Sequence, residues 1–261
     1  MPLLELKNIT KRFDGLVAVS EVSCAVEPGL IFALIGPNGA GKTTVFNMLT
    51  GMTAITSGQA YFKGLELNSL PPYRVTELGL GRTFQNIRLF NRMSVLDNVI
   101  VGFHCRTRTG LAGALLKLGS ARREWTETRM KAMELLRRFG LDGVKDELTG
   151  NLPYGQQRGL EIVRALATAP DLLLLDEPAA GLNIAETEVL MRQITALRDE
   201  LGKTILLIEH DMKLVMGISD HIVVLDHGCK IAEGAPANIQ TNERVIEAYL
   251  GSGFRKTHAG H

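Results

Sequence analysis

A run of eight residues near the start of the chain matches the spacing of a phosphate-binding loop, GxxxxGK(S/T). Its glycines let backbone amides turn towards phosphate oxygens, while Lys42 can reach the β- and γ-phosphates and the Thr43 hydroxyl can bind Mg²⁺. A chance Gly-rich turn is the alternative, but an apolar run precedes the loop and an amphipathic stretch follows it. The run therefore predicts a site for ATP and Mg²⁺. The predicted ATP-binding residues are Gly36, Pro37, Asn38, Gly39, Ala40, Gly41, Lys42, Thr43 and Thr44.

Two adjacent carboxylates, Asp176 and Glu177, end the apolar run Leu172–Leu175. Open α/β sheets bind ligands at the carboxyl ends of their strands. Successive side chains of a strand point in opposite directions, so Asp176 can face Mg²⁺ or its water while Glu177 faces the attacking water. Taken alone, the pair is equally well explained as a solvated strand end. In the same chain as a phosphate loop, it predicts ATP hydrolysis.

Short apolar runs alternate with helical stretches around these motifs. A buried strand at Leu30–Ile35 leads through the loop into a helix from about Gly41 to Leu49. Such alternation favours parallel strands joined by crossover helices. The later elements are strands at Leu172–Leu175, Thr204–Ile208 and Ile222–Leu225 and helices at Ala185–Leu201 and Asp211–Ile218.

The N-terminal segment carries the pattern of a hairpin. Leu3–Ile9 and Val17–Val26 are rich in alternating or β-branched residues, and the turn-forming pair Asp14-Gly15 separates them. These runs predict antiparallel strands at an edge of a sheet.

Helix formers dominate from Arg88 to Leu166, most clearly at Glu127–Phe139. The sequence therefore predicts an α/β fold, with a P-loop NTPase (RecA-like) core, an antiparallel β subdomain and an inserted α-helical subdomain. Residues 1–250 are expected to form a single ATPase domain, with the core at 1–87 and 167–250, the helical subdomain at 88–166 and a frayed tail at 251–261.

Composition excludes some classes of protein. The 261 residues are 45% hydrophobic, and 29 Lys+Arg against 28 Asp+Glu give a net charge of +1. This balance lacks the excess of positive charge that is typical of a nucleic-acid-binding protein. Cys24, Cys105 and Cys229 lack metal-binding spacing and fit a reducing compartment.

The N-terminus does not look like a secretory signal, so the mature chain is expected to start at Met1. No run approaches the roughly 20 apolar residues of a membrane span, so any spanning would fall to another chain.

Together the motifs resemble the nucleotide-binding subunits of ABC transporters, from about residue 3 to Leu250. The resemblance implies that Phe13 stacks on adenine, that Gln85 senses Mg²⁺ and the γ-phosphate, and that His210 contacts the γ-phosphate. It makes Glu177, His210 and Gln85 the catalytic residues, and Thr43, Gln85 and Asp176 the Mg²⁺ ligands. A lone aromatic, Gln or His is often structural, but the order of these residues along the chain favours the functional reading.

The family's LSGGQ motif is altered in this chain. The corresponding segment is Leu152–Arg158, in which Pro153 replaces the serine and Tyr154 replaces a glycine. The resemblance implies that Gly155 and Gln156 cap the γ-phosphate of ATP held by the opposite subunit. Proline is tolerated at a helix start, so the change weakens one phosphate contact without affecting the fold.

Several runs resemble one of the two ATPase subunits of bacterial branched-chain amino-acid importers. They are Arg82–Phe90, the pair Tyr154-Gly155, Asp176–Asn183 and Ile208–Met216. Urea and short-amide importers are similar in the same runs, so the cargo rests on analogy.

The resemblance implies a set of partners and a location. These are transmembrane permease subunits, a second ATPase subunit in a homo- or heterodimer, and indirectly an external substrate-binding protein, with the chain peripheral at the cytoplasmic face of the inner membrane. The segment Ile87–Asn98 is expected to dock the membrane subunits, and Ala180–Asn183 to cross the dimer interface. A basic stretch could lie near anionic lipid headgroups, although a solvated basic loop is the better explanation. That stretch comprises His104, Arg106, Arg108, Lys117, Arg122 and Arg123.

Two other classes of nucleotide-binding protein are alternatives. ABC-type ATPases of DNA repair, chromosome structure or ribosomes usually carry coiled coils, zinc modules or tandem ATPase domains, and the sequence shows one phosphate loop and no heptad run. A regulatory nucleotide-binding module without turnover would not need Glu177 and His210.

Overall fold

The computed structural model describes residues 1–106 and 119–250. The predicted tail Gly251–His261, and Arg108 and Lys117 of the basic stretch, lie outside the described residues. The chain divides into two compact units, one formed by Met1–Val75 with Thr195–His261 and the other by Thr76–Ile194.

A four-stranded antiparallel sheet in the first unit has the order β2-β1-β4-β5. The predicted hairpin is confirmed, since Phe13 pairs with Leu16 across the turn Asp14-Gly15 and Asp14 has a left-handed φ of 47°. Of the two hairpin strands, β2 lies at the edge of the sheet, whereas β1 also pairs with β4. The strands are β1 (Leu4–Phe13), β2 (Leu16–Val26), β4 (Ser57–Phe62) and β5 (Leu65–Glu66).

The other strands of the first unit follow the order β10-β9-β3-β8. As predicted, β3 (Ile31–Ile35) pairs in parallel with β8 (Thr204–Ile208) and β9 (His221–Asp226). Their continuous apolar runs suit strands that are covered on both faces. The strand β10 (Cys229–Gly234), antiparallel to β9, was not predicted, because it is polar and partly exposed.

Short helices complete this unit, and the first, α1, begins at Lys42 within the predicted phosphate loop. Helix α8 begins where predicted, because Asp211 caps it by accepting bonds from the amides of Lys213 and Leu214 at 2.8 and 3.1 Å. The helices are α1 (Lys42–Leu49), α8 (Met212–Ile218), α9 (Pro236–Gln240) and α10 (Glu243–Leu250), and α2 (Pro72–Leu78) spans the sequence boundary between the units.

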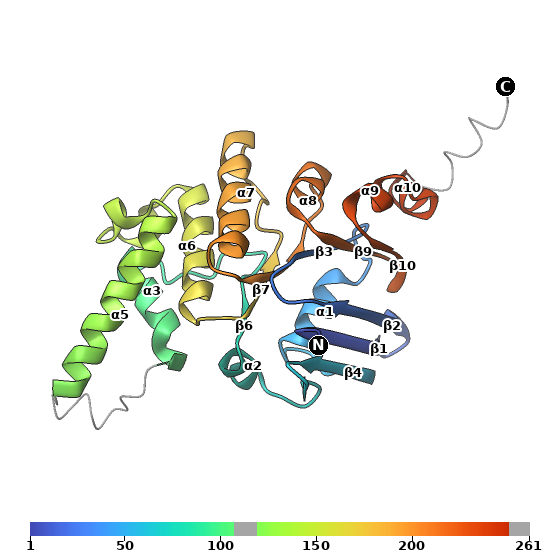
Figure 1. The fold of residues 1–261 in the computed structure, drawn as a ribbon, viewed down its shortest axis with the longest axis horizontal. Helices are drawn as coiled ribbons and strands as arrows, with labels where there is room; N and C mark the ends of the chain where they lie inside the picture. The colour runs from blue at the N-terminus through green and yellow to red at the C-terminus, as the bar shows by residue number, and fades with distance from the viewer. Residues whose placement is uncertain (107–118, 251–261) are drawn as a thin grey trace. The chain divides into compact units, whose positions relative to one another are not determined.

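The second unit contains a parallel strand pair, β6 (Leu80–Arg82) and β7 (Leu172–Asp176), and a group of helices. Buried Asn98 ties the group together, since its amide donates to the Phe90 carbonyl at 3.1 Å and to the Thr149 hydroxyl at 2.8 Å. Helices α3, α5 and α6 pack together (Figure 1), which confirms the predicted helical character of this region. The elements are α3 (Val95–Gly102), α5 (Gly119–Arg138), α6 (Tyr154–Ala167) and the 3₁₀ turns η1 (Phe103–Arg106), η2 (Asp142–Val144) and η3 (Thr149–Asn151). Helix α7 (Ile184–Asp199) spans the sequence boundary between the units.

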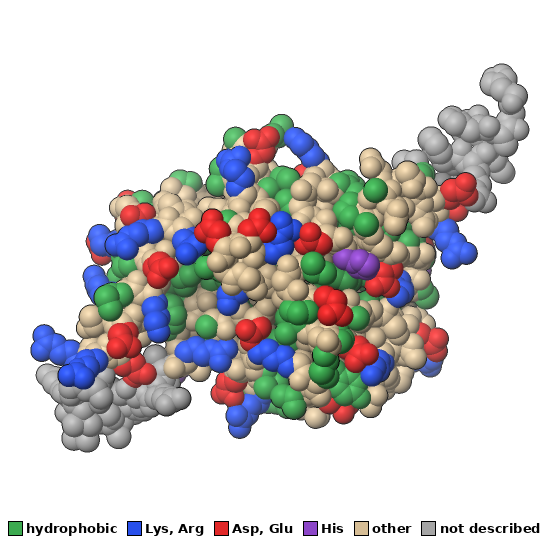
Figure 2. All heavy atoms as spheres, viewed as in Figure 1, with side chains coloured by type: hydrophobic (Ala, Val, Ile, Leu, Met, Phe, Trp, Pro, Cys, Tyr) green, Lys and Arg blue, Asp and Glu red, His purple; other side chains and the backbone are tan. Residues whose placement is uncertain are grey.

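The surface carries charges of both signs. On the face shown in Figure 2, acidic and basic side chains are interspersed, in keeping with the net charge of +1. Among the described residues, no helix is both long and apolar enough to cross a membrane. Cys24, Cys105 and Cys229 are free thiols; Cys105 and Cys229 are exposed, whereas burial of the Cys24 thiol raises its pKa to about 12.

Candidate nucleotide site

The phosphate loop needs glycine at two of its positions. Gly36 has a φ of 148°, and a Cβ there would lie 2.0 Å from the Leu225 carbonyl oxygen. Gly41 has a φ of 98°, and a Cβ there would lie 2.5 Å from the Ala18 carbonyl oxygen. Close backbone approach therefore fixes the loop between β9 and β2, with its amide groups at the start of α1.

Lys42 is folded back over this loop. Its buried ammonium donates to the carbonyls of Gly36 and Pro37 at 2.7 and 2.9 Å. Helix α1 has no acidic residue in its first turn and no side-chain cap. Its N-terminal amides and the lysine charge together suit an anion such as a phosphate group.

Phe13 and His210 also belong to the first unit. Phe13 ends β1 and is 46% exposed as a residue, and the Lys11 ammonium lies 4.8 Å from its ring centroid. The His210 side chain is 59% exposed and follows β8 and buried Glu209. Both side chains are thus accessible for contact with a ligand, as a base-stacking ring and a phosphate-contacting imidazole must be.

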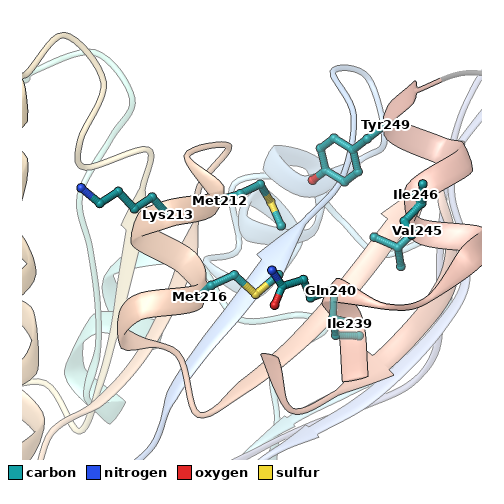
Figure 3. A pocket seen from close by; sticks show the side chains of 8 residues that line it. All are labelled: Met212, Lys213, Met216, Ile239, Gln240, Val245, Ile246 and Tyr249. Atoms are coloured by element: carbon teal, nitrogen blue, oxygen red, sulfur yellow. The ribbon is translucent and has the colours of Figure 1, made fainter. Parts of the chain in front are cut away.

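A cavity of about 470 Å³ lies among α8, α9 and α10 and was not predicted. Figure 3 shows Met212 and Met216 reaching from α8 towards α9 and α10, while Lys213 points away. Burial raises the pKa of Tyr249, which lines the cavity, and a hydrogen bond with the Gly36 backbone opposes that effect. The last helix of the described chain is therefore linked to the phosphate loop. The lining residues are Met212, Lys213, Met216, Ile239, Gln240, Val245, Ile246 and Tyr249.

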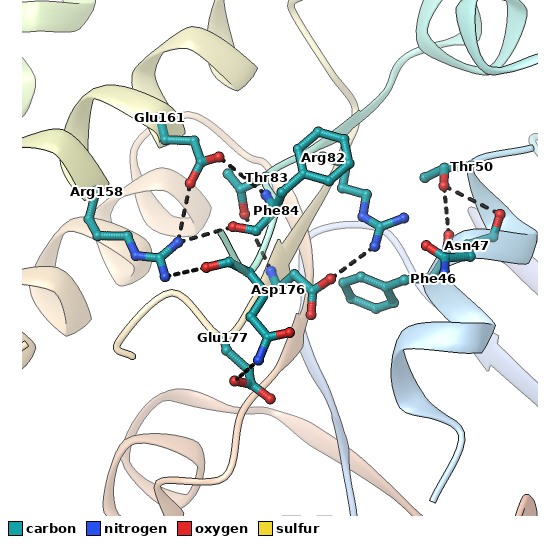
Figure 4. A network of polar contacts seen from close by, with 11 residues as sticks. Phe46, Asn47, Thr50, Arg82, Thr83, Phe84, Arg158, Glu161, Asp176 and Glu177 are labelled. Carbon is teal, nitrogen blue, oxygen red and sulfur yellow. Dashed lines mark hydrogen bonds and ion pairs between the residues drawn. The ribbon is translucent and has the colours of Figure 1, made fainter. Parts of the chain in front are cut away.

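In the second unit, Asp176 ends the buried strand β7, and its side chain is only 2% exposed (Figure 4). Its Oδ2 accepts a bond from Arg82 Nη2 at 2.9 Å, while Oδ1 has no hydrogen-bond partner among the described residues. Burial raises the pKa of Asp176, and the Arg82 guanidinium opposes that shift. A buried carboxylate oxygen without a donor suits a hard cation such as Mg²⁺.

Glu177 follows with a left-handed φ of 47°, a strained conformation for a residue with a side chain. Its Oε2 accepts a bond from Gln85 Nε2 at 2.9 Å, and its carbonyl accepts from the Ala180 amide at 3.1 Å. The structure thus brings together Gln85 and Glu177, two of the predicted catalytic residues.

The altered LSGGQ-like segment begins helix α6. Pro153 is the N-cap and Tyr154 the first helical residue. A Cβ on Gly155 would lie 2.7 Å from Glu186 Oε1, and a Cβ on Gly181 would lie 2.9 Å from the Tyr154 ring. The tyrosine that replaces the family glycine therefore packs against the segment 180–183. Gln156, the other predicted capping residue, is the third residue of α6 and is half-buried.

The sequence did not predict the roles of two charged residues, Arg158 and Glu161, which bond to the backbone around Gln85. Arg158 Nη1 donates to the Phe84 carbonyl at 3.0 Å and pairs with Glu161 at 3.3 Å, and Arg158 Nη2 donates to the Gln85 carbonyl (Figure 4). Glu161 accepts from the amides of Phe84 and Arg88 at 3.4 and 3.3 Å. The sequence signal that could have indicated this pair is the spacing of Arg158 and Glu161, two opposite charges three residues apart after Gly155.

Comparison with known proteins places these features in one family. Residues 19–180 match the family model described as ABC transporter, and residues 229–255 match that of the branched-chain amino acid ATP-binding cassette transporter. The chain therefore belongs to the ABC transporter family, and it is an ATP-hydrolysing cassette with the predicted P-loop NTPase fold.

Particular relatives are similar over nearly the whole length. The chain is 48% identical to the high-affinity branched-chain amino acid transport ATP-binding protein LivG of Escherichia coli (strain K12), over 96% of this chain and 98% of LivG. A nucleotide-free ATP-binding cassette from an ABC transporter superposes with a TM-score of 0.83 at 32% identity, covering 96% of this chain and all of that one. A dimeric cassette bound to ADP and Pi matches with a TM-score of 0.75 at 26% identity, covering 89% of this chain and 98% of that one.

Proposed function

We propose that this chain is one of the ATPase subunits that power an importer of branched-chain amino acids. The similarity to LivG over nearly the full length of both proteins carries the proposal. The match of residues 229–255 to a family model for branched-chain amino-acid cassettes supports it separately. A urea or short-amide importer is the alternative that an experiment must exclude, because the ATPase subunit itself does not select the cargo.

We propose that the phosphate loop and the carboxylates act on one ATP molecule. The loop from Gly36 to Thr44 would hold the phosphates, with Lys42 on the β- and γ-phosphates, and Phe13 would stack on the adenine. Thr43, Asp176 and Gln85 would hold Mg²⁺, which supplies charge neutralisation at the phosphates when bound. Two observations support these assignments: Asp176 Oδ1 has no hydrogen-bond partner among the described residues, and Phe13 is exposed.

Glu177 would act as the base that polarises the attacking water. Its Oε2 is held by Gln85 Nε2, so Gln85 orients the carboxylate until water and the γ-phosphate are in place. His210 would contact the γ-phosphate from its exposed position after β8. In-line attack then needs only positioning and electrostatic stabilisation from these side chains.

The capping residues Gly155 and Gln156 would serve the ATP of a second ATPase subunit. A dimeric cassette with ADP and Pi is among the similar structures, which supports a pair of cassettes as the working unit. We further propose that the pair binds transmembrane permease subunits through Ile87–Asn98 and acts peripherally at the cytoplasmic face of the inner membrane. An external binding protein would deliver the cargo.

The domain limits belong to the same proposal. Residues 1–250 would form a single ATPase domain, with the core at 1–87 and 167–250 and the helical subdomain at 88–166.

The test is reconstitution with the membrane subunits in liposomes that contain ATP, together with the external binding protein. Uptake of labelled leucine that needs ATP, and stimulation of ATPase by leucine with its binding protein, are the expected results. Uptake of urea or a short amide without uptake of leucine would reject the proposed cargo. ATPase that never responds to any cargo or membrane partner would reject the transport role.

A further inference from the structure

Arg82 lies where two strands place it beside the predicted metal ligand. It is the last residue of β6 and pairs with Leu174 of β7, two residues before Asp176. Because β6 and β7 are parallel, their carboxyl ends meet at the same edge of the sheet. The two side chains are 7% and 2% exposed, so this is a buried ion pair, with Arg82 Nη2 at 2.9 Å from Asp176 Oδ2.

The two carboxylate oxygens of Asp176 have different surroundings. Oδ2 is held by a charge-assisted hydrogen bond from a planar guanidinium, which restricts rotation of the carboxylate. Oδ1 is buried and has no hydrogen-bond partner among the residues that the structure describes. The oxygen left for a cation is therefore Oδ1, in one fixed orientation.

Arg82 is itself held from a second side. Its guanidinium carbon lies 5.1 Å from the centroid of the Phe84 ring, while that of Arg88 lies 4.3 Å from the same ring. The Arg82 side chain is almost fully buried, whereas Arg88 is exposed. Both arginines thus share the aromatic contact, and of the two it is Arg82 whose guanidinium donates a hydrogen bond to Asp176.

We propose that Arg82 is a positioning residue of the metal site, which anchors Asp176 through Oδ2 so that Oδ1 binds Mg²⁺. The inference rests on the proposed role of Asp176 as a metal ligand. Partners that orient a metal-binding carboxylate typically contribute about 10–100-fold to metal affinity. Loss of the Arg82 guanidinium should therefore weaken Mg²⁺ binding in the presence of ATP, while metal-free ATP binding stays unchanged.

The test is ATP binding to the full chain, measured by fluorescence with a labelled ATP, first in EDTA and then during titration with Mg²⁺. Arg82→Gln should raise the half-saturating Mg²⁺ concentration about 10–100-fold, Arg82→Lys should raise it less, and both should keep the affinity measured in EDTA. Arg137→Gln, which removes an exposed arginine of α5, should behave as the unsubstituted chain. Binding of paramagnetic Mn²⁺ with ATP, followed by electron spin resonance, should show the same order of affinities.

The outcomes separate this inference from the proposed function. Asp176→Asn should weaken Mg²⁺ binding in the same assay; if it does not, the metal-ligand role of Asp176 is wrong. If Asp176→Asn has its effect but Arg82→Gln titrates as the unsubstituted chain, only the Arg82 inference is rejected. Loss of ATP binding in EDTA in both Arg82 variants would also overturn it, because Arg82 would then support the fold or the nucleotide and not the metal.

Discussion

Lys42 carries the positive charge of the phosphate loop on a side chain that contacts two loop carbonyls, those of Gly36 and Pro37. A hydrogen bond to a charged phosphate oxygen contributes about 1.5–3 kcal/mol. Lys42→Ala should therefore weaken MgATP binding by about 10–150-fold and reduce turnover in parallel. Equilibrium binding and phosphate release measure the two quantities. Normal affinity together with a normal rate would show that the loop is not the ATP site.

Glu177 is predicted to be needed for ATP hydrolysis but not for ATP binding. Glu177→Gln keeps the size of the side chain but removes the carboxylate, so turnover should fall by about 10²–10⁴-fold while ATP stays bound. Single-turnover phosphate release and nucleotide retention are the measurements. Glu134→Gln, at an exposed site on α5, should leave both unchanged. Loss of ATP binding in Glu177→Gln would show that the carboxylate is needed for the fold or for the nucleotide.

At the scale of elements, the start of α6 is bonded to the segment that carries Gln85. Arg158 and Glu161 are 4% and 2% exposed, and together they bond to the backbone of Phe84, Gln85 and Arg88. Hydrogen bonds therefore connect α6 to the segment of Gln85, whose side chain in turn bonds to Glu177.

Removing one partner of this buried pair should be costly, because it leaves a buried charge unpaired. Arg158→Met should lower the free energy of unfolding by about 3–5 kcal/mol, measured by urea denaturation. Arg138→Met removes an arginine whose pair with Glu134 is partly exposed, and it should cost at most about 1 kcal/mol. Equal losses in the two variants would show that the α6 connection adds no stability.

The elements that sequence reasoning found are those with long apolar runs. The strands β3, β7 and β8 are buried at every residue, so their boundaries were close to the observed ones. The strand β6 has three residues and β10 is half-exposed, so neither carries a periodic signal. The side chains of the phosphate loop could be assigned because their spacing is a local motif. Arg82 and Arg158 could not, since their roles depend on tertiary pairing.

At the scale of the whole molecule, the altered motif predicts unequal ATP sites in a pair of different cassettes. Pro153 has no hydroxyl to donate to a γ-phosphate oxygen, a bond of about 1.5–3 kcal/mol. The Gly155 amide and the start of α6 remain to cap the partner's nucleotide. If the second ATPase subunit carries a serine in its motif, the site built from Lys42 and Glu177 of this chain is the stronger one.

Glu177→Gln should therefore reduce the ATPase of the assembled transporter more than the matching substitution in the other subunit. Pro153→Ser should raise activity by less than about tenfold, the factor that 1.4 kcal/mol corresponds to. The two glutamine variants are to be assayed side by side in the reconstituted complex. Equal losses, or a greater loss from the other subunit's variant, would reject the asymmetry.

The distribution of the thiols has a practical consequence for following the catalytic cycle. Cys229 lies in the first unit and Cys105 in the second, and both are exposed. Cys24 has a pKa of about 12, so at neutral pH it is almost wholly the unreactive thiol. Dyes coupled to the unsubstituted chain would thus mark one position on each compact unit. Energy transfer between such dyes would report, without any engineered cysteine, whether the distance between the two labelled positions changes as ATP binds and is hydrolysed.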